Sequence, residues 1–230
     1  GWHVPITVLD GEEGRLMSKQ CHPDGGLLLG IAVDDSRAKC VLSNKSGAQL
    51  EDVPRLLRRA KELQLDVRGV SFHVGSGCET SDAPDGWVDA VDRAAHVFEV
   101  AAREGVAMDI LDIGGGFPGV DTEQLAFADI AAALRVALRR HFPGSRGVQL
   151  IAEPGRFIAA TSHTLATSII AKKTVRGEGG EAVFSNYTLN DGLYGSFNCI
   201  LYDHQEPKFE VLRAPTDAPG APVVPASIWG

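Results

Sequence analysis

The chain has 230 residues, with 22 lysines and arginines against 30 aspartates and glutamates, so its net charge is −8 and its pI is near 5.3. Hydrophobic residues make up 44% and charged residues 23%, which is typical of a globular protein with a buried core. An acidic chain without a basic cluster argues against nucleic acid as a partner, and the longest stretch without charged side chains, 157–171, is too short and too polar to span a membrane.

Short apolar segments recur about every 40 residues and are typical of buried strands. They cover residues 27–33, 67–74, 108–113 and 148–152. Between them, apolar residues recur every three or four positions, which predicts helices over 53–63, 88–102 and 127–138. Asp52, just before Pro54, predicts the start of the first helix, and Gly105 predicts the end of the second.

This alternation of strands and helices predicts β/α units and a parallel sheet. Four consecutive units are half of an eight-unit barrel, so we expect an α/β fold with a partial barrel over residues 1–156. Residues 157–230 are expected to hold the barrel end and the start of a β-rich domain.

The pattern after residue 156 has no helical period. Serine, threonine and β-branched residues are frequent in 161–175, and 182–190 and 198–202 are also predicted to be strands. The glycine-rich segment 176–181 predicts a hairpin loop, and the proline- and alanine-rich segment 215–225 predicts an exposed connection.

The cysteine spacing argues against a zinc site and is typical of a reducing compartment. Cys21, Cys40, Cys78 and Cys199 contain no C-x-x-C pair, so the sequence predicts no zinc site. Scattered thiols in a chain of this length are typical of a reducing compartment. The first residues also lack a basic segment followed by an apolar one, so we expect a cytoplasmic protein without a secretory leader.

Gly114, Gly115 and Gly116 directly follow a predicted strand. Backbone N–H groups without side chains around them can bind an anion, and phosphate is the usual one. The contiguous glycines and Pro118 differ from the dinucleotide motif G-x-G-x-x-G. On spacing alone, a phosphate loop and a tight turn are equally supported.

Other polar residues also end predicted strands. His73 closes the segment 67–74 and Ser76 follows it, although a lone histidine is more often a core residue and Ser76 a turn residue. Glu153 and Arg156 follow the segment 148–152. They either pair with each other or bind two parts of one ligand, since arginine suits a phosphate and glutamate suits a protonated ring nitrogen.

Four segments together resemble one family. They are His-Val-Gly-Ser-Gly-Cys at 73–78, Asp-Ile-Gly-Gly-Gly-Phe-Pro-Gly at 112–119, Glu-Pro-Gly-Arg at 153–156, and residues 190–204, which end in Tyr-Asp-His. In this order they are similar to the ornithine decarboxylase family, enzymes with an alanine racemase-like (β/α)8 barrel followed by a β-domain. The resemblance extends over 27–230, and 190–204 is similar to the eukaryotic-type ornithine enzymes.

The resemblance implies pyridoxal 5′-phosphate as the cofactor and L-ornithine as the substrate, which is decarboxylated to putrescine in polyamine biosynthesis. It implies that His73 stacks on the cofactor ring and that Glu153 pairs with its nitrogen, so both are expected to be catalytic. Tyr202 and Asp203 are expected to bind the substrate, with Asp203 at its distal ammonium group; by residue type alone they fit an exposed strand end. The residues expected to hold the cofactor phosphate are Ser76, Gly114, Gly115, Gly116 and Arg156.

The resemblance also implies a homodimer, with Tyr194 near the contact, and antizyme as a further partner. The lysine that binds the family's cofactor is expected before residue 1, and a catalytic cysteine after Gly230, so the chain alone is expected to be incomplete as an enzyme. Gly30 stands where the family usually has arginine. Two alternatives stay open: a non-catalytic relative that binds antizyme, as antizyme inhibitors do, and another phosphate-binding barrel such as a racemase, which residues 190–204 disfavour.

Overall fold

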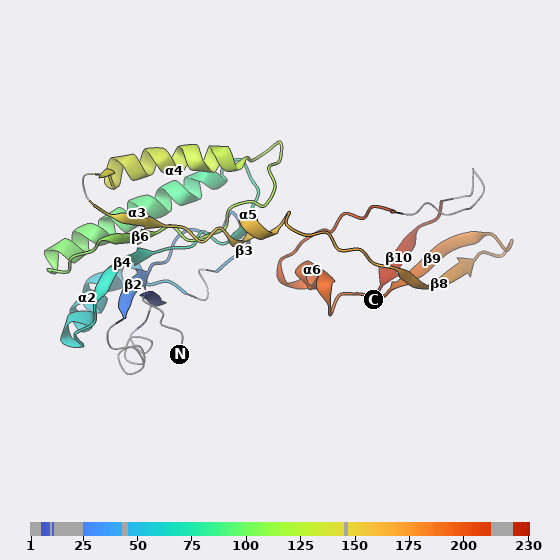
Figure 1. Ribbon diagram of the computed structural model, residues 1–230, viewed down its shortest axis with the longest axis horizontal. Coiled ribbons are helices and arrows are strands. Elements are labelled where there is room, and N and C mark those ends of the chain that lie inside the picture. The colour runs from blue at the N-terminus through green and yellow to red at the C-terminus, as the bar shows by residue number, and fades with distance from the viewer. Residues whose placement is uncertain (1–5, 10, 12–24, 43–45, 145–146, 213–222) are drawn as a thin grey trace. The chain divides into compact units, whose positions relative to one another are not determined.

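The structure is a computed structural model and describes residues 6–9, 11, 25–42, 46–144, 147–212 and 223–230. It divides into two compact units, Gly1–Ser162 and His163–Gly230. The first unit contains a five-stranded parallel sheet and three long helices (Figure 1). Within the described ranges, no helix is long and apolar enough to cross a membrane.

The sheet of the first unit has the strand order of a barrel. Across the sheet the strands are β1 (Ile6–Leu9), β2 (Gly26–Gly30), β4 (Val67–Ser71), β6 (Ile110–Asp112) and β7 (Gln149–Ile151). Each parallel strand lies beside the next one along the chain, whereas a doubly wound sheet reverses its order. The four predicted strands are confirmed as β2, β4, β6 and β7. The sequence did not predict β1.

Three helices cover one face of this sheet (Figure 1). They are α2 (Val53–Glu62), which follows the short 3-10 turn η1 (Leu50–Asp52), α3 (Ala83–Arg103) and α4 (Phe127–His141). These helices confirm the three predicted periodic segments. Gly105 follows α3 with a φ of +71°, a left-handed conformation that glycine adopts without strain, so the predicted end of this helix is also confirmed.

The two faces of the sheet differ in chemistry. Leu29, Val70 and Leu111 point into the hydrophobic core between the sheet and the helices, where Trp87 of α3 is fully buried. Because successive side chains of a strand point to opposite faces, the residues next to these three point away from the helices. The helix-free face therefore carries Gly30, Ser71 and Asp112, which are register partners on β2, β4 and β6.

A short antiparallel ribbon adds to the first unit. It is formed by β3 (Ala38–Cys40) and β5 (Ser76–Cys78), neither of which the sequence predicted. Its register places Ser76, the first residue of β5, opposite Cys40. The structure describes Cys40, Cys78 and Cys199, and none of these three is in a disulfide.

The second unit contains a three-stranded sheet. The strands β8 (Ile169–Arg176) and β9 (Ala182–Leu189) are antiparallel, and β10 (Ala226–Trp229) pairs with β9 in parallel. The predicted hairpin loop is confirmed, since the Gly177 N–H donates to the Glu181 carbonyl at 2.9 Å. Most of the predicted connection 215–225 lies outside the described residues.

The prediction of a strand over 198–202 is wrong. The chain forms the 3-10 turn η3 (Ser196–Asn198) and the short helix α6 (Cys199–Tyr202) instead. The Asp191 carboxylate accepts hydrogen bonds from the N–H groups of Gly192 and Ser196, at 2.7 and 3.0 Å, and so closes the chain into turns. Four apolar residues are too few to show either the helical or the strand period, so local side-chain hydrogen bonding decides the conformation.

Candidate active site

The predicted site residues of the first unit gather where β4, β6 and β7 end. Backbone hydrogen bonds continue past the strands and hold the three following loops together. The donor–acceptor pairs are Phe72 N to Asp112 O at 3.2 Å, Ile113 N to Ile151 O at 2.9 Å, and Glu153 N to Gly114 O at 2.7 Å. These bonds fix the segments that carry His73, the glycine loop and Glu153 against one another.

The three glycines run so close to neighbouring backbone that no side chain fits. A Cβ atom on Gly114, whose φ is +61°, would lie 2.1 Å from the Phe72 carbonyl oxygen. One on Gly116, whose φ is +95°, would lie 2.4 Å from the Gly75 carbonyl oxygen. One on Gly115 would lie 2.6 Å from the Glu153 carbonyl oxygen and 2.9 Å from His73 Nε2. The loop therefore passes between the ends of β4 and β7, beside the imidazole.

Ser76 and Arg156 meet at the same edge, although 80 positions separate them in the sequence. Arg156 lies in the short helix α5 (Gly155–Ala159), and its Nη2 donates to Ser76 Oγ at 2.8 Å. A guanidinium group beside a hydroxyl group and a glycine loop offers charged and neutral donors to one anion. Arg156 thus engages Ser76, and the negative charge that acts on the Glu153 carboxyl group is that of Asp112.

His73 is a half-buried, neutral imidazole. The Gly75 N–H donates to Nδ1 at 3.1 Å, so Nδ1 is an acceptor and the proton of the neutral ring is on Nε2. Burial lowers the pKa of His73, against the opposing charges of Asp112 and Asp35. A neutral ring with a fixed tautomer can pack face-on against an aromatic group without placing a charge there.

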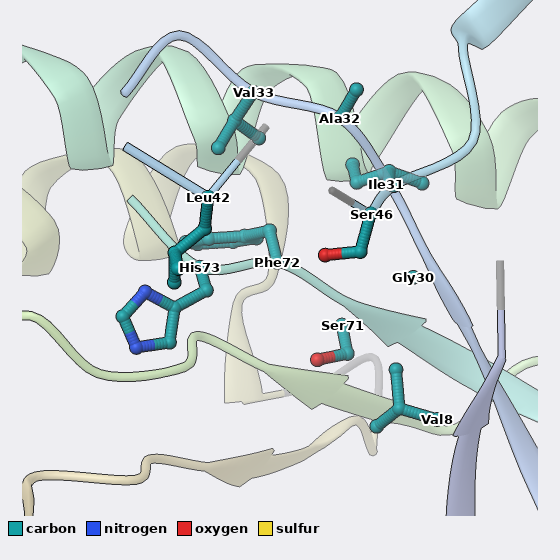
Figure 2. A pocket seen from close by; sticks show the side chains of 11 residues that line it. Val8, Gly30, Ile31, Ala32, Val33, Leu42, Ser46, Ser71, Phe72 and His73 are labelled. Carbon is teal, nitrogen blue, oxygen red and sulfur yellow. The ribbon is translucent and has the colours of Figure 1, made fainter. Parts of the chain in front are cut away.

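A cavity of ≈ 370 Å³ opens beside this histidine on the helix-free side of the sheet. In Figure 2 the hydroxyl groups of Ser46 and Ser71 point toward the side on which the His73 ring lies, and Val8 faces them from β1. Gly30 also lines the cavity. The family resemblance predicts an arginine at this position. The absence of a side chain there leaves this part of the wall uncharged.

Asp112 is a further polar residue of the site, and the sequence alone predicts no role for it. Only 2% of its surface is exposed. Its Oδ1 accepts from the Gly114 N–H at 2.9 Å, and its Oδ2 accepts from Ser71 Oγ at 3.2 Å. Desolvation, and then the charge and hydrogen bonding of Asp112, raise the pKa of the Glu153 carboxyl group.

Tyr202 and Asp203 lie in the second unit. Tyr202 ends α6 with 75% of its surface exposed, and Asp203 follows with its N–H donating to the Cys199 carbonyl at 3.0 Å. The structure therefore brings together the predicted cofactor-binding residues, all of which belong to the first unit, and leaves the predicted substrate-binding pair in the other.

Comparison with known proteins identifies the class of this site. Residues 3–160 match the family described as pyridoxal-dependent decarboxylase, pyridoxal binding domain. The chain belongs to this family of pyridoxal-dependent decarboxylases. The chain is similar to ornithine decarboxylase of Mus musculus, with 46% identity over 236 residues, and to antizyme inhibitor 2 of Xenopus laevis, with 42% identity over 235 residues. Each alignment covers 99% of this chain and 50% of the relative, so the chain spans about half the length of these curated relatives.

A solved structure agrees with this family. The arginine decarboxylase of Paramecium bursaria Chlorella virus superposes with a TM-score of 0.85 and 30% sequence identity, covering 98% of this chain and 58% of that chain. The family and this neighbour confirm the predicted fold class, and the family confirms pyridoxal phosphate as the predicted cofactor.

The residues present fit that cofactor. The glycine loop forms a cradle that any Cβ atom would fill, and the Arg156–Ser76 pair places a cation and a hydroxyl group beside it. Glu153 supplies a carboxyl group that holds a proton more readily than usual. A phosphate, an aromatic ring and a basic ring nitrogen each find a matching group at this edge of the sheet.

Proposed function

We propose that the protein to which this sequence belongs decarboxylates L-ornithine to putrescine, a step of polyamine biosynthesis. The observation that carries the proposal is the convergence of an imidazole, a carboxyl group, a glycine cradle and a serine–arginine pair at one sheet edge. The 46% identity to ornithine decarboxylase supports ornithine as the substrate.

Each residue of the first unit has one task in this proposal. Ser76, the glycine loop and Arg156 bind the cofactor phosphate, since they offer hydroxyl, backbone and guanidinium donors. His73 packs on the ring as a neutral imidazole. Glu153 holds a proton at the ring nitrogen. When bound, pyridoxal phosphate supplies an electron sink for the negative charge that develops at Cα as carbon dioxide leaves.

The second unit supplies the substrate-binding residues of the proposal. Asp203 binds the distal ammonium group of ornithine, with Tyr202 beside it. In this assignment residues 1–156 form the cofactor-binding part of the barrel, and 157–230 form the barrel end and the start of the β-domain.

We further propose a cytoplasmic homodimer. Tyr194 is 95% exposed, and it lines a cavity of ≈ 460 Å³ in the second unit together with exposed Trp229 and half-buried Phe197. Exposed aromatic side chains around a hollow are typical of surfaces that bind another protein. A second copy of the chain is the partner that the family resemblance implies.

Decarboxylation is tested with the complete gene product that contains this sequence, loaded with pyridoxal phosphate. We expect release of carbon dioxide from L-ornithine at a higher kcat/KM than from L-lysine or L-arginine. Glu153→Ala should lower kcat at least about 100-fold, because a side chain positioned for proton transfer contributes on this scale. Glu123→Ala, at an exposed glutamate outside the site, is the matched control. No carbon dioxide release from any of the three amino acids would refute the proposal.

Asp203→Ala tests the substrate assignment separately. We expect a higher KM for ornithine with less change in kcat, because the distal ammonium is bound alike before and during the reaction. An unchanged KM would remove Asp203 from the substrate site.

A second candidate function is antizyme binding without catalysis. The 42% identity to antizyme inhibitor 2 favours it, as does Gly30 in the wall of the cavity. In this case the purified protein would bind antizyme in a calorimetric titration and release no carbon dioxide from ornithine. Release of carbon dioxide from ornithine that is lost in Glu153→Ala would contradict this second candidate.

A further inference from the structure

A row of four aromatic rings connects the elements around the glycine loop. Trp87 stacks on Phe117, with 5.2 Å between the ring centroids. Phe117 contacts Phe127 edge-on, with 5.8 Å between the centroids, and Phe127 contacts Phe157, with 4.4 Å. The row therefore runs from α3, through the segment after the glycine loop and the start of α4, to α5.

Phe127 is the ring between the two parts of the proposed anion site. Phe117 directly follows Gly116 of the glycine loop, and Phe157 directly follows Arg156. Because neighbouring residues share a rigid peptide unit, a shift of either ring carries the adjacent donor group with it. The contacts of Phe127 with both rings therefore couple the position of Arg156 to that of the loop.

The backbone next to these rings is packed closely as well. A Cβ atom on Gly119 would lie 2.4 Å from the Ala160 Cβ and 3.1 Å from the Arg156 carbonyl oxygen. The absence of a side chain at Gly119 thus lets α5 lie directly on the segment that leaves the glycine loop. The aromatic contact and this glycine contact are two independent connections between α5 and the first part of the site.

Phe127 itself is held by the loop that precedes α4. Its N–H donates to Asp121 Oδ1 at 2.8 Å. Within the same loop, the Leu125 N–H donates to Thr122 Oγ1 at 3.1 Å. Side-chain oxygens that accept from N–H groups at the start of a helix fix the path of the entering chain. The ring of Phe127 therefore extends from a backbone position that hydrogen bonds define.

We propose that Phe127 is a positioning residue: through its contact with Phe157, it holds Arg156 ready to bind the cofactor phosphate. The inference rests on the proposed role of Arg156 at that phosphate. The Arg156 Nη2 donates to Ser76 Oγ at 2.8 Å, so the guanidinium group is held beside the hydroxyl group that shares this role. A donor that is placed in advance loses less conformational freedom on binding. The ring of Phe127 thus contributes to phosphate affinity without touching the phosphate.

The test compares two ligands that differ only in the phosphate group. Pyridoxamine 5′-phosphate and pyridoxamine lack the aldehyde, so both bind without covalent attachment, and each is titrated calorimetrically into the complete gene product. Phe127→Ala should lower the affinity for pyridoxamine 5′-phosphate about 3- to 10-fold, the range of an aromatic contact, and leave that for pyridoxamine unchanged. Phe127→Tyr keeps the ring and should retain the wild-type ratio of the two affinities.

Two further variants separate positioning from folding. Phe157→Ala changes a side chain that is 38% exposed, so the fold should tolerate it, and it should lower the same affinity by a similar factor. Phe142→Ala is the matched control. Phe142 follows the other end of α4 and contacts Phe98, with 5.0 Å between the ring centroids. Its loss should lower the free energy of unfolding and leave the affinity ratio unchanged.

The effect of Phe127 should disappear when Arg156 is removed. In an Arg156→Ala background, Phe127→Ala should change the ratio no further, because the two residues act as one unit. An unchanged ratio in Phe127→Ala and Phe157→Ala, an equal fall in Phe142→Ala, or a further fall in the Arg156→Ala background would overturn the inference. With a lower ratio in Arg156→Ala alone, these results leave the proposed phosphate role of Arg156 intact. An unchanged ratio in Arg156→Ala would overturn both.

Discussion

Replacing Gly114 by alanine tests whether the glycine loop is required by the fold itself. The substitution places a methyl group 2.1 Å from the Phe72 carbonyl oxygen, well inside the 3.0 Å that real Cβ contacts keep. That oxygen belongs to the segment directly after β4, which backbone hydrogen bonds hold against Asp112. The clash can be relieved only by moving backbone.

The magnitude follows from two contributions. A left-handed φ of +61° costs alanine about 1–2 kcal/mol relative to glycine. Crowding a packed interior costs a further ~1–3 kcal/mol. The expected loss in the free energy of unfolding is therefore about 2–5 kcal/mol.

Gly105→Ala is the matched control. Its φ is +71°, close to that of Gly114, but its Cβ would meet only the tip of Lys61, at an ordinary 3.5 Å. It should lose only the conformational cost of about 1–2 kcal/mol.

Urea denaturation without cofactor, followed by far-UV circular dichroism, measures both variants. This signal reports mainly on α2, α3 and α4, which all belong to the first unit. If Gly114→Ala destabilises the protein no more than Gly105→Ala, the close backbone approach is not a constraint on folding and the reasoning is refuted.

Three further predictions concern single side chains. Burial raises the pKa of Cys78 to about 11, so at pH 8 its thiol should react with iodoacetamide far more slowly than that of Cys40. The contribution of the Cys78 thiol to stability should be complete below pH 9 and lost as the pH rises through 11. Burial lowers the pKa of His73 below 6.5, so an NMR titration should find it neutral at pH 7, and a midpoint at or above 6.5 would contradict this; because the unfolded chain binds the proton more readily, stability should fall as the pH drops below 6.5. Trp87→Ala should lower the free energy of unfolding, measured in urea, by about 3–5 kcal/mol. The indole is fully buried and stacks on Phe117, with 5.2 Å between the ring centroids. A loss below about 1 kcal/mol would show that the core closes around the gap.

Elements with a long periodic pattern were predictable from the sequence. The helix α3 has 21 residues, and its apolar positions repeat often enough to define one face. The short ribbon of β3 and β5 was not predictable, because each strand has three residues and their pairing joins segments far apart in the sequence. The strand prediction for the four apolar residues 199–202 failed for a related reason. Hydrogen bonds from backbone N–H groups to the Asp191 carboxylate outweighed a pattern too short to carry a period.

The candidate site divides in the same way. His73, the glycine loop and Glu153 were predictable because each directly follows an apolar strand, and parallel strands bring their carboxyl ends to one edge. The role of Asp112 was not, because it depends on register. A shift of one residue between β6 and β7 would turn Glu153 to the other face and separate the two carboxyl groups.

The glycine loop belongs to the fold and to the site at once, which changes how its mutations must be interpreted. The Gly114 N–H donates to Asp112, and the Gly114 carbonyl accepts from the Glu153 N–H. A substitution that displaces this loop therefore displaces Asp112 and Glu153 together with the phosphate cradle. Loss of cofactor binding in a glycine variant identifies phosphate contacts only if unfolding of the cofactor-free protein is unchanged.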